Sequence, residues 1–212
     1  MIRIKLIVVI VLVIIPNLVL AGLFGYQENR RLNLEIFPQW LLVIERHLKE
    51  NMPEGNCETR VLDTCHMAKW HLFIKNIKNM SKLDQIQKVN EFANQKKYIL
   101  DIENYGLEDY WAIPKEFLYN NGDCEDYAIT KMMSLKALGF EDEEMKLVVL
   151  QDTNLRIPHA ILVVKFQGDF LIMDNQIKEV ISHKHILHYA PIYAVNQKSW
   201  WMYLPEVKNE KL

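Results

Sequence analysis

The apolar residues of this chain recur at helical spacing in its first half and at strand-like spacing in its second half. A regular apolar stripe predicts a helix over 32–51. The stripe consists of Ile36, Trp40, Leu41, Val43, Ile44 and Leu48. Further helices are predicted over 62–77 and from Ser81 onward, because Ser81 is a suitable N-cap. Residues 98–121 are rich in aromatic side chains and contain Pro114, which interrupts helices, so we expect an extended connection there.

An amphipathic helix is predicted from Cys124 to Leu138, because apolar residues recur along one face of this segment. They are Ala128, Met132, Leu135 and Leu138. Asp123 lies just before the helix and is a good N-cap, and Gly139 just after its end suits the C′ position.

Strand-like patterns follow this helix. They cover residues 146–151, 159–166, 170–174 and 189–195. A turn over 167–169 connects the second and third of these strands, which predicts a hairpin. Because helices come first and strands second, the predicted fold class is α+β, with N-terminal helices followed by an antiparallel sheet.

The first residues have the pattern of an export signal. Arg3 and Lys5 precede the apolar run 6–15, and Val19-Leu20-Ala21 is a passable cleavage site. The alternative is an uncleaved membrane anchor over 6–24. The chain therefore divides into a signal peptide or anchor over 1–21 and one domain over 22–212. Within that domain we expect a helical part over 30–97 and a core over 98–205.

Composition adds two constraints. The chain of 212 residues is half hydrophobic and carries a formal charge of −2, so no basic excess points to nucleic acid as a partner. In an oxidising compartment Cys57 and Cys65 are spaced for a disulfide. Packed reduced thiols, or a zinc site with His66 and His71, are the alternatives. The disulfide would leave Cys124 as an odd cysteine, whereas in the packed alternative all three cysteines are reduced.

The segment 121–127 (NGDCEDY) places Cys124 among Asp123, Glu125 and Asp126 at the predicted start of a helix. Neighbouring carboxylates raise the pKa of a thiol, whereas catalysis by sulfur needs the thiolate. Two things can offset the negative charge: the positive end of the helix, or a bound cation that takes up the carboxylates. The simpler alternative is that the acids only cap the helix and the cysteine only packs.

A base and a group that orients it are candidates in the predicted hairpin. His159 opens one strand and Asp174 closes the next, so both lie toward the same edge of the sheet. A two-residue turn at Gly168-Asp169 places Asp174 opposite Val163, which leaves about four residues, or roughly 13 Å, to His159. A bulge, strong coiling or a different turn must close that gap.

Several segments in this order resemble the bacterial transglutaminase-like cysteine peptidases of LapG type, over roughly 80–200. The segments are 109–117 (DYWAIPKEF), 122–128 (GDCEDYA), 159–162 (HAIL), 173–175 (MDN) and 191–196 (PIYAVN). The resemblance implies a papain-like core in its transglutaminase form. It also implies Cys124 as nucleophile at a helix N-terminus, His159 as base and Asp174 as the residue that orients it.

The same resemblance implies a cofactor, a location and partners. Asp123 and Glu125 match calcium-ligating acids of the family, and Asp126 is placed to add a further oxygen to bound Ca²⁺. The family members are periplasmic proteases that cut a large surface adhesin near its N-terminus at a di-alanine site, which releases it and controls biofilm attachment. They are held by an inner-membrane receptor of LapD type that senses cyclic di-GMP.

The sequence therefore allows three interpretations of the function. The chain is expected to be an exported, calcium-dependent cysteine endopeptidase that touches the membrane only through its signal or anchor. A transamidase of the same fold and a non-catalytic calcium-binding module that recognises a receptor or adhesin are the alternatives. Trp111, shortly before the cysteine, is a candidate for lining a substrate cleft, with a place in the core as the other interpretation.

Overall fold

The computed structural model describes residues 22–50 and 65–205, so the predicted signal over 1–21, and Cys57 of the predicted disulfide, lie outside the described residues. The helices are α1 (Pro38–Glu50), α2 (His66–Ile77), α3 (Lys82–Ala93), α4 (Asp101–Asn104), α5 (Pro114–Asn120) and α6 (Cys124–Ala137). The strands are β1 (Tyr26–Arg31), β2 (Met145–Asp152), β3 (Ile157–Phe166), β4 (Asp169–Met173), β5 (Ile181–Ser182), β6 (Tyr189–Val195) and β7 (Trp200–Pro205).

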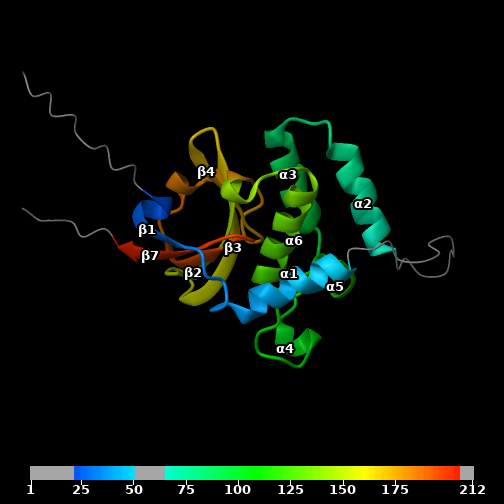
Figure 1. Cartoon of the computed structure of the whole chain (residues 1–212), viewed down its shortest axis with the longest axis horizontal. Helices are drawn as coiled ribbons and strands as arrows, with labels where there is room; N and C mark the ends of the chain where they lie inside the picture. The colour runs from blue at the N-terminus through cyan, green and yellow to red at the C-terminus, as the bar shows by residue number, and fades with distance from the viewer. Residues whose placement is uncertain (1–21, 51–64, 206–212) are drawn as a thin grey trace, which may run out of the picture.

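The strands form one antiparallel sheet in the order β1-β7-β6-β2-β3-β4-β5. The helices gather on one side of it, with α6 packed against β3 and β2 and with α3 and α5 packed on α6 (Figure 1). This arrangement confirms the predicted α+β class with helices before an antiparallel sheet. None of the described helices is long and apolar enough to span a bilayer.

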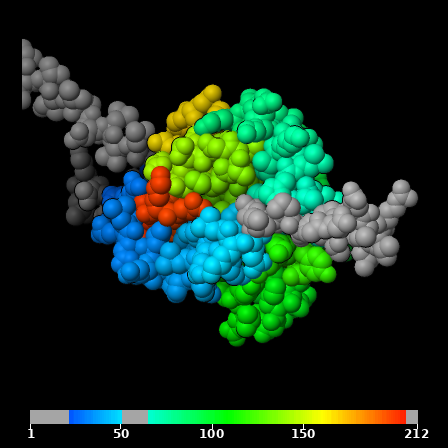
Figure 2. All heavy atoms as spheres, turned by 45° about the vertical axis from the view of Figure 1, so that its right-hand side comes forward, coloured from blue at the N-terminus to red at the C-terminus, as the bar shows by residue number. Residues whose placement is uncertain are grey.

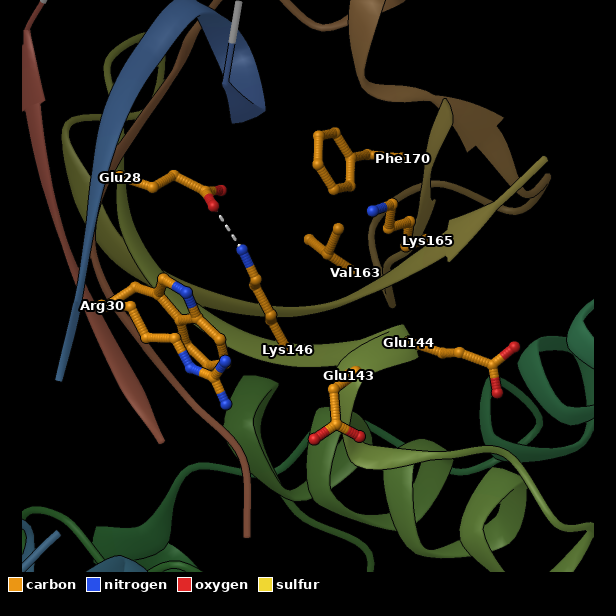
Figure 3. Close-up of a pocket in the computed structure, with 9 residues that line it drawn as sticks. Glu28, Arg30, Glu143, Glu144, Lys146, Val163, Lys165 and Phe170 are labelled. Carbon is orange, nitrogen blue, oxygen red and sulfur yellow. Dashed lines mark hydrogen bonds and ion pairs between the residues drawn. The ribbon is translucent and has the colours of Figure 1, made fainter. Parts of the chain in front are cut away.

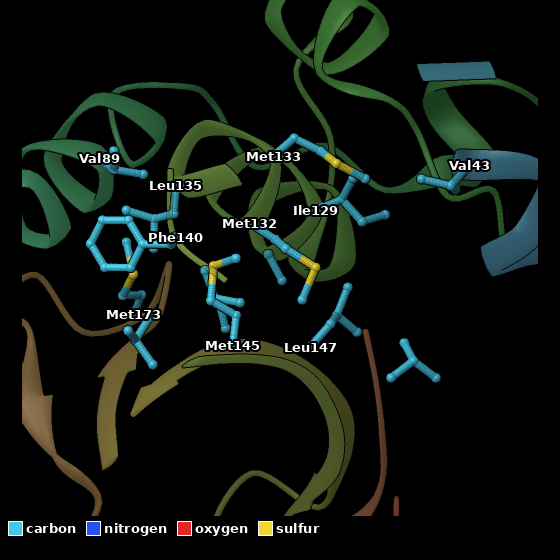
Figure 4. Close-up of a cluster of buried hydrophobic side chains, with 14 of the residues drawn as sticks. Val43, Val89, Ile129, Met132, Met133, Leu135, Phe140, Met145, Leu147 and Met173 are labelled. Atoms are coloured by element: carbon cyan, nitrogen blue, oxygen red, sulfur yellow. The ribbon is translucent and has the colours of Figure 1, made fainter. Parts of the chain in front are cut away.

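Helix α6 is the centre of the structure. Its residues from Glu125 to Leu135 are all buried, so the predicted amphipathic helix with one apolar face is wrong. The helix is enclosed because the sheet covers one side while α3 and α5 cover others. Figure 4 shows Met132 and Met133 of α6 among side chains from the surrounding elements, including Val89 of α3 and Met145 and Leu147 of β2. Packing on every side holds the start of this helix in a fixed place.

The sheet curls around a second core on its other face. Glu28 of the edge strand β1 reaches Lys146 of β2, with Oε2 and Nζ 2.6 Å apart, although β7 and β6 lie between these strands in the sheet. Both residues line a cavity of about 170 Å³ (Figure 3). Lys146 Nζ also lies 4.4 Å from the centre of the Trp201 ring, a cation–π contact that the curled sheet makes possible.

Three strands and two short helices differ from the sequence-based expectations, and one of these strands is the two-residue β5. The terminal strands β1 and β7 pair with each other and are adjacent on the surface (Figure 2), and neither was predicted. The helix predicted over 32–51 begins only at Pro38. The connection over 98–121 is not extended throughout, because Pro114 is the first residue of α5 instead of a break, a position where its missing N–H costs nothing.

Lys131 of α6 is fully buried, and its Nζ has no hydrogen-bond partner among the described residues. Burial lowers the pKa of Lys131 to about 7, while the nearby charge of Asp174 acts in the opposite direction. The unfolded chain therefore binds this proton more tightly than the folded protein does at pH values above about 7 and below the ordinary lysine pKa.

We expect the K131M variant to lose a pH dependence that wild type has. In wild type, this group makes the free energy of unfolding rise with pH by up to about 1.4 kcal/mol per pH unit across that window. Urea unfolding at several pH values measures the difference: K131M should gain most over wild type at the acidic end. K88M, at an exposed position of α3, serves as the control, and a constant gap between K131M and wild type would contradict the account.

Candidate active site

The start of α6 is fixed by a glycine and a buried carboxylate. Cys124 is the first residue of α6. A Cβ on Gly122 would lie 2.0 Å from Asp126 Oδ2, so only glycine fits beside this side chain. Asp126 is fully buried, and its carboxylate accepts hydrogen bonds from the backbone N–H of Ala112 (2.7 Å) and of Asp123 (3.3 Å). These bonds tie the loop before α5 to the beginning of the helix that carries the cysteine.

Asp123 occupies the predicted N-cap position, but its side chain makes no capping hydrogen bond. Its Oδ1 is buried and has no hydrogen-bond partner among the described residues. The predicted N-cap position of Asp123 is therefore confirmed, with Asp126 at the third helical position supplying the reciprocal contact to the Asp123 N–H. The Asp123 Oδ1 atom is left available to a ligand.

His159 and Asp174 are brought together by the β3–β4 hairpin, with Nε2 and Oδ1 2.9 Å apart. The turn consists of Gln167 and Gly168, both at positive φ, instead of Gly168 and Asp169. Met173 consequently pairs with Leu162, which leaves a gap of about two residues, or roughly 7 Å, that the two side chains span. The gap between His159 and Asp174 that we expected from the sequence is therefore closed by a different turn. No bulge is present between β3 and β4.

The Asp174 carboxylate accepts hydrogen bonds from three donors: His159 of β3, Tyr189 of β6 and Gln176 in the loop after β4. Besides His159, the Gln176 backbone N–H donates to Oδ1 (2.9 Å) and the Tyr189 hydroxyl donates to Oδ2 (2.7 Å). Burial raises the pKa of Asp174, but the hydrogen bonds and the charge of His159 outweigh it and leave that pKa below its usual value. Asp174 is thus held as an anion and occupies Nε2 of His159. The other ring nitrogen, Nδ1, has a long contact of 3.5 Å with Nε2 of the Gln176 side chain, which a proton donor at Nδ1 would have to displace.

Cys124 is a free cysteine whose Sγ donates a hydrogen bond to Glu125 Oε2 at 3.2 Å. The backbone N–H of Ala160 interacts with the sulfur, which places it next to the residue that follows His159. Burial, with the charges of Glu125 and Asp123, raises the pKa of Cys124 well above its usual value. Among the described residues, no hydrogen bond joins this sulfur to His159. The thiol is therefore neutral as long as the acids around it are uncompensated.

The acids around the cysteine form a larger group than the sequence indicated. Asp101, Asp109 and Glu125 have carboxylate oxygens within 4.8 Å of one another, and so do Asp101, Asp123 and Asp126. Asp101 lies in the short helix α4 and joins the two sets. Sequence analysis missed it, because its segment was interpreted as an extended connection and nothing in its spacing marks it. Asp109 lies within a motif that carried the family resemblance.

This group of carboxylates fits a cation. Burial raises the pKa of Asp101 to about 6 and that of Glu125 to about 10, with neighbouring carboxylates adding to both. Asp101 Oδ1 and Asp123 Oδ1 are buried without hydrogen-bond partners in the described part of the chain. Unpaired, buried carboxylate oxygens are costly, and they are the ligands that Ca²⁺ prefers. Asp123 and Glu125, two of the predicted ligands, are in the group with Asp101, whereas both oxygens of Asp126 are already engaged by backbone N–H groups.

Trp111 belongs mainly to the core. It is 7% exposed, packs with its ring centre 6.2 Å from that of Trp40, and donates from Nε1 to Asp109 Oδ1 at 3.0 Å. It also borders a cavity of about 260 Å³ between α1 and the loop before α5, together with Leu42 and Arg46. The structure therefore supports the interpretation of Trp111 as a core residue, and its place in a substrate cleft stays a prediction.

The sequence profile of the bacterial transglutaminase-like cysteine proteinases (BTLCP) matches residues 55–209 of the chain. The chain belongs to this family. It is a cysteine peptidase by membership, and the predicted family resemblance is confirmed. The comparison with curated proteins found no significant match.

Solved structures of Legionella pneumophila LapG are similar to this BTLCP chain. One LapG structure is 26% identical over 76% of this chain and 87% of its own, with a TM-score of 0.61. Calcium-bound LapG is 25% identical over 80% of this chain and 93% of its own, with a TM-score of 0.63. EGTA-treated LapG has a TM-score of 0.61 at 26% identity, over 76% of this chain and 84% of its own. The fold is thus LapG-like over most of both chains.

We expect the D101N variant to bind Ca²⁺ more weakly than wild type, because Asp101 joins both sets of carboxylates. At a Ca²⁺ concentration of about 100 times the dissociation constant, binding adds about 2.7 kcal/mol to wild-type stability. Calorimetric titration and unfolding with and without Ca²⁺ measure the loss. E103Q, at an exposed acid of the same helix, is the matched control. Equal Ca²⁺ stabilisation of D101N and wild type would exclude Asp101 as a ligand.

Proposed function

We propose that this protein is a calcium-dependent cysteine endopeptidase in which Cys124, His159 and Asp174 perform the chemistry. The observation that supports this most strongly is the buried contact of His159 with Asp174 at 2.9 Å, at the strand that passes the start of α6. Family membership supports the reaction class, and the position of Cys124 at a helix N-terminus supports its part as nucleophile.

In the proposed reaction, His159 Nδ1 takes the proton of the Cys124 thiol, and the sulfur attacks the carbonyl of the scissile peptide bond. The N–H groups at the start of α6 are positioned to stabilise the negative oxygen that forms. His159 then protonates the leaving amine, and an acyl-enzyme on Cys124 remains. Water, activated by the same imidazole, releases the acid and restores the thiol. Asp174 holds the ring with Nε2–H directed at its carboxylate throughout.

Asp101, Asp123 and Glu125 are the residues that would hold Ca²⁺, with Asp109 at the border of the group. The ion, when bound, supplies positive charge beside the cysteine and lowers the cost of burying these acids. Glu125 Oε2 accepts the thiol hydrogen bond in this structure. A ligand role for that oxygen competes with the thiol bond and favours transfer of the proton to His159 instead.

The proposed substrate is a large surface adhesin, cut near its N-terminus at a di-alanine type of site, which releases it and ends attachment in a biofilm. The support is the likeness to LapG and the resemblance of the motifs around Cys124, His159 and Asp174. The export pattern of residues 1–21 supports a periplasmic location. An inner-membrane receptor of LapD type that responds to cyclic di-GMP is the proposed partner that holds the protease back.

The test incubates the protein with N-terminal fragments of large adhesins from the same cell, with Ca²⁺ or with EGTA. We expect one specific cut with Ca²⁺ that is absent with EGTA. C124A and H159A should reduce cleavage by a factor of about 10³ or more, because groups that act as a unit are lost together. H185A, at an exposed histidine, is the control for H159A and should retain cleavage.

The other outcomes separate the alternatives. Full cleavage in EGTA would refute the calcium dependence. Joining of a labelled amine to an acceptor protein, without hydrolysis, would identify a transamidase. Undiminished function of C124A would identify a binding module and overturn the peptidase proposal.

A further inference from the structure

One contact of Asp174 is used by none of the steps above. Its Oδ1 atom is shared by His159 Nε2 and the Gln176 N–H, whereas its Oδ2 atom accepts from the Tyr189 hydroxyl at 2.7 Å. Asp174 is 1% exposed and Tyr189 is 4% exposed, so solvent does not replace this hydrogen bond easily. The far oxygen of the carboxylate is thus held by a tyrosine from β6, a strand that pairs with β2 and not with the hairpin that carries His159 and Asp174.

The contact has a geometric consequence. The terminal torsion of an aspartate is broad, so donors to one oxygen alone leave the plane of the carboxylate free to turn. A hydrogen bond on each oxygen fixes that plane, and with it the direction in which Oδ1 meets the imidazole. Loss of the hydroxyl would leave Oδ2 buried without its partner, which costs free energy in the charged form of the carboxylate.

Tyr189 is itself held in place. Its ring makes edge contacts with the rings of His159 and Phe24, at centre distances of 5.8 Å each, and with His188 at 4.6 Å. Its backbone is fixed because β6 pairs with β2 through Tyr189 and Asp152. Burial and the Asp174 charge raise the pKa of Tyr189 above its usual value, so the hydroxyl stays a donor.

We propose that Tyr189 is a positioning residue of the peptidase: it fixes the Asp174 carboxylate so that His159 keeps Nε2 protonated and presents Nδ1 to the thiol. This inference rests on the proposed function. It gives β6 a part in the active site, namely the hydrogen bond to Asp174 Oδ2. Neither α6, which carries Cys124, nor the β3–β4 hairpin, which carries His159, supplies this bond. Tyr189 does not touch the reacting atoms and acts through Asp174.

The test compares Y189F with wild type, because phenylalanine keeps the ring contacts and removes only the hydroxyl. We expect kcat for fragment cleavage to fall roughly 10-fold to 100-fold, as for a lost hydrogen bond to a charged group, with KM nearly unchanged. In a D174N background, Y189F should cause little further loss, because its effect passes through the carboxylate. Y203F is the matched control, since Tyr203 is a buried tyrosine of β7 that lies near Glu28.

A second readout does not depend on cleavage. Nitrogen NMR of labelled histidine reports which ring nitrogen of His159 carries the proton. We expect the Nε2–H form in wild type and in Y203F, and a mixture of both tautomers in Y189F. An unchanged tautomer with kcat within about twofold of wild type would overturn the proposal. If wild type cleaves no adhesin fragment, the proposed function fails, and the NMR result alone still decides whether Tyr189 positions the pair.

Discussion

Burial of carboxylates around the first turn of α6 is the constraint on which the rest of the site depends. The buried members of the group are Asp101, Asp123, Glu125 and Asp126, and the exposed Asp109 lies beside them. Only Asp126 has both oxygens satisfied by backbone N–H groups, and it uses them to fasten the helix start to the preceding loop. Burial raises the pKa of the Cys124 thiol, and the charges of Glu125 and Asp123 raise it further. The proposed function therefore includes a cation that compensates these acids.

The fold turns that constraint into a site by enclosing α6 on every side. A helix that is buried on all sides cannot rotate about its axis or slide along it. The position of Cys124, the first residue of this helix, is therefore fixed relative to the sheet. The β3–β4 hairpin fixes His159 and Asp174 through its turn register, and β6 adds Tyr189 from the other side of β2. The hairpin thus links the other two parts, because the Ala160 N–H interacts with the Cys124 sulfur and Asp174 accepts from the Tyr189 hydroxyl.

Sequence patterns were sufficient where local physics decides the outcome. The helix from Cys124, the N-cap at Ser81 and the strands around His159 and Tyr189 follow from periodicity and capping, and each is present. The patterns failed where distant contacts decide. β1 is an edge strand with mostly exposed residues, so no apolar alternation marks it, and Asp101 joins the acids only through the fold. The register of the β3–β4 hairpin depends on which two residues form its turn. The sequence around Gly168 is compatible with more than one position of that turn.

The most direct test of this account measures the reactivity of Cys124 itself. The rate at which iodoacetamide alkylates this cysteine, followed on its own peptide by mass spectrometry, reports the thiolate fraction. The account predicts faster alkylation at neutral pH with Ca²⁺ than with EGTA, because the bound ion compensates the acids beside the sulfur. Equal rates in the two conditions, or slower alkylation with Ca²⁺, would contradict it.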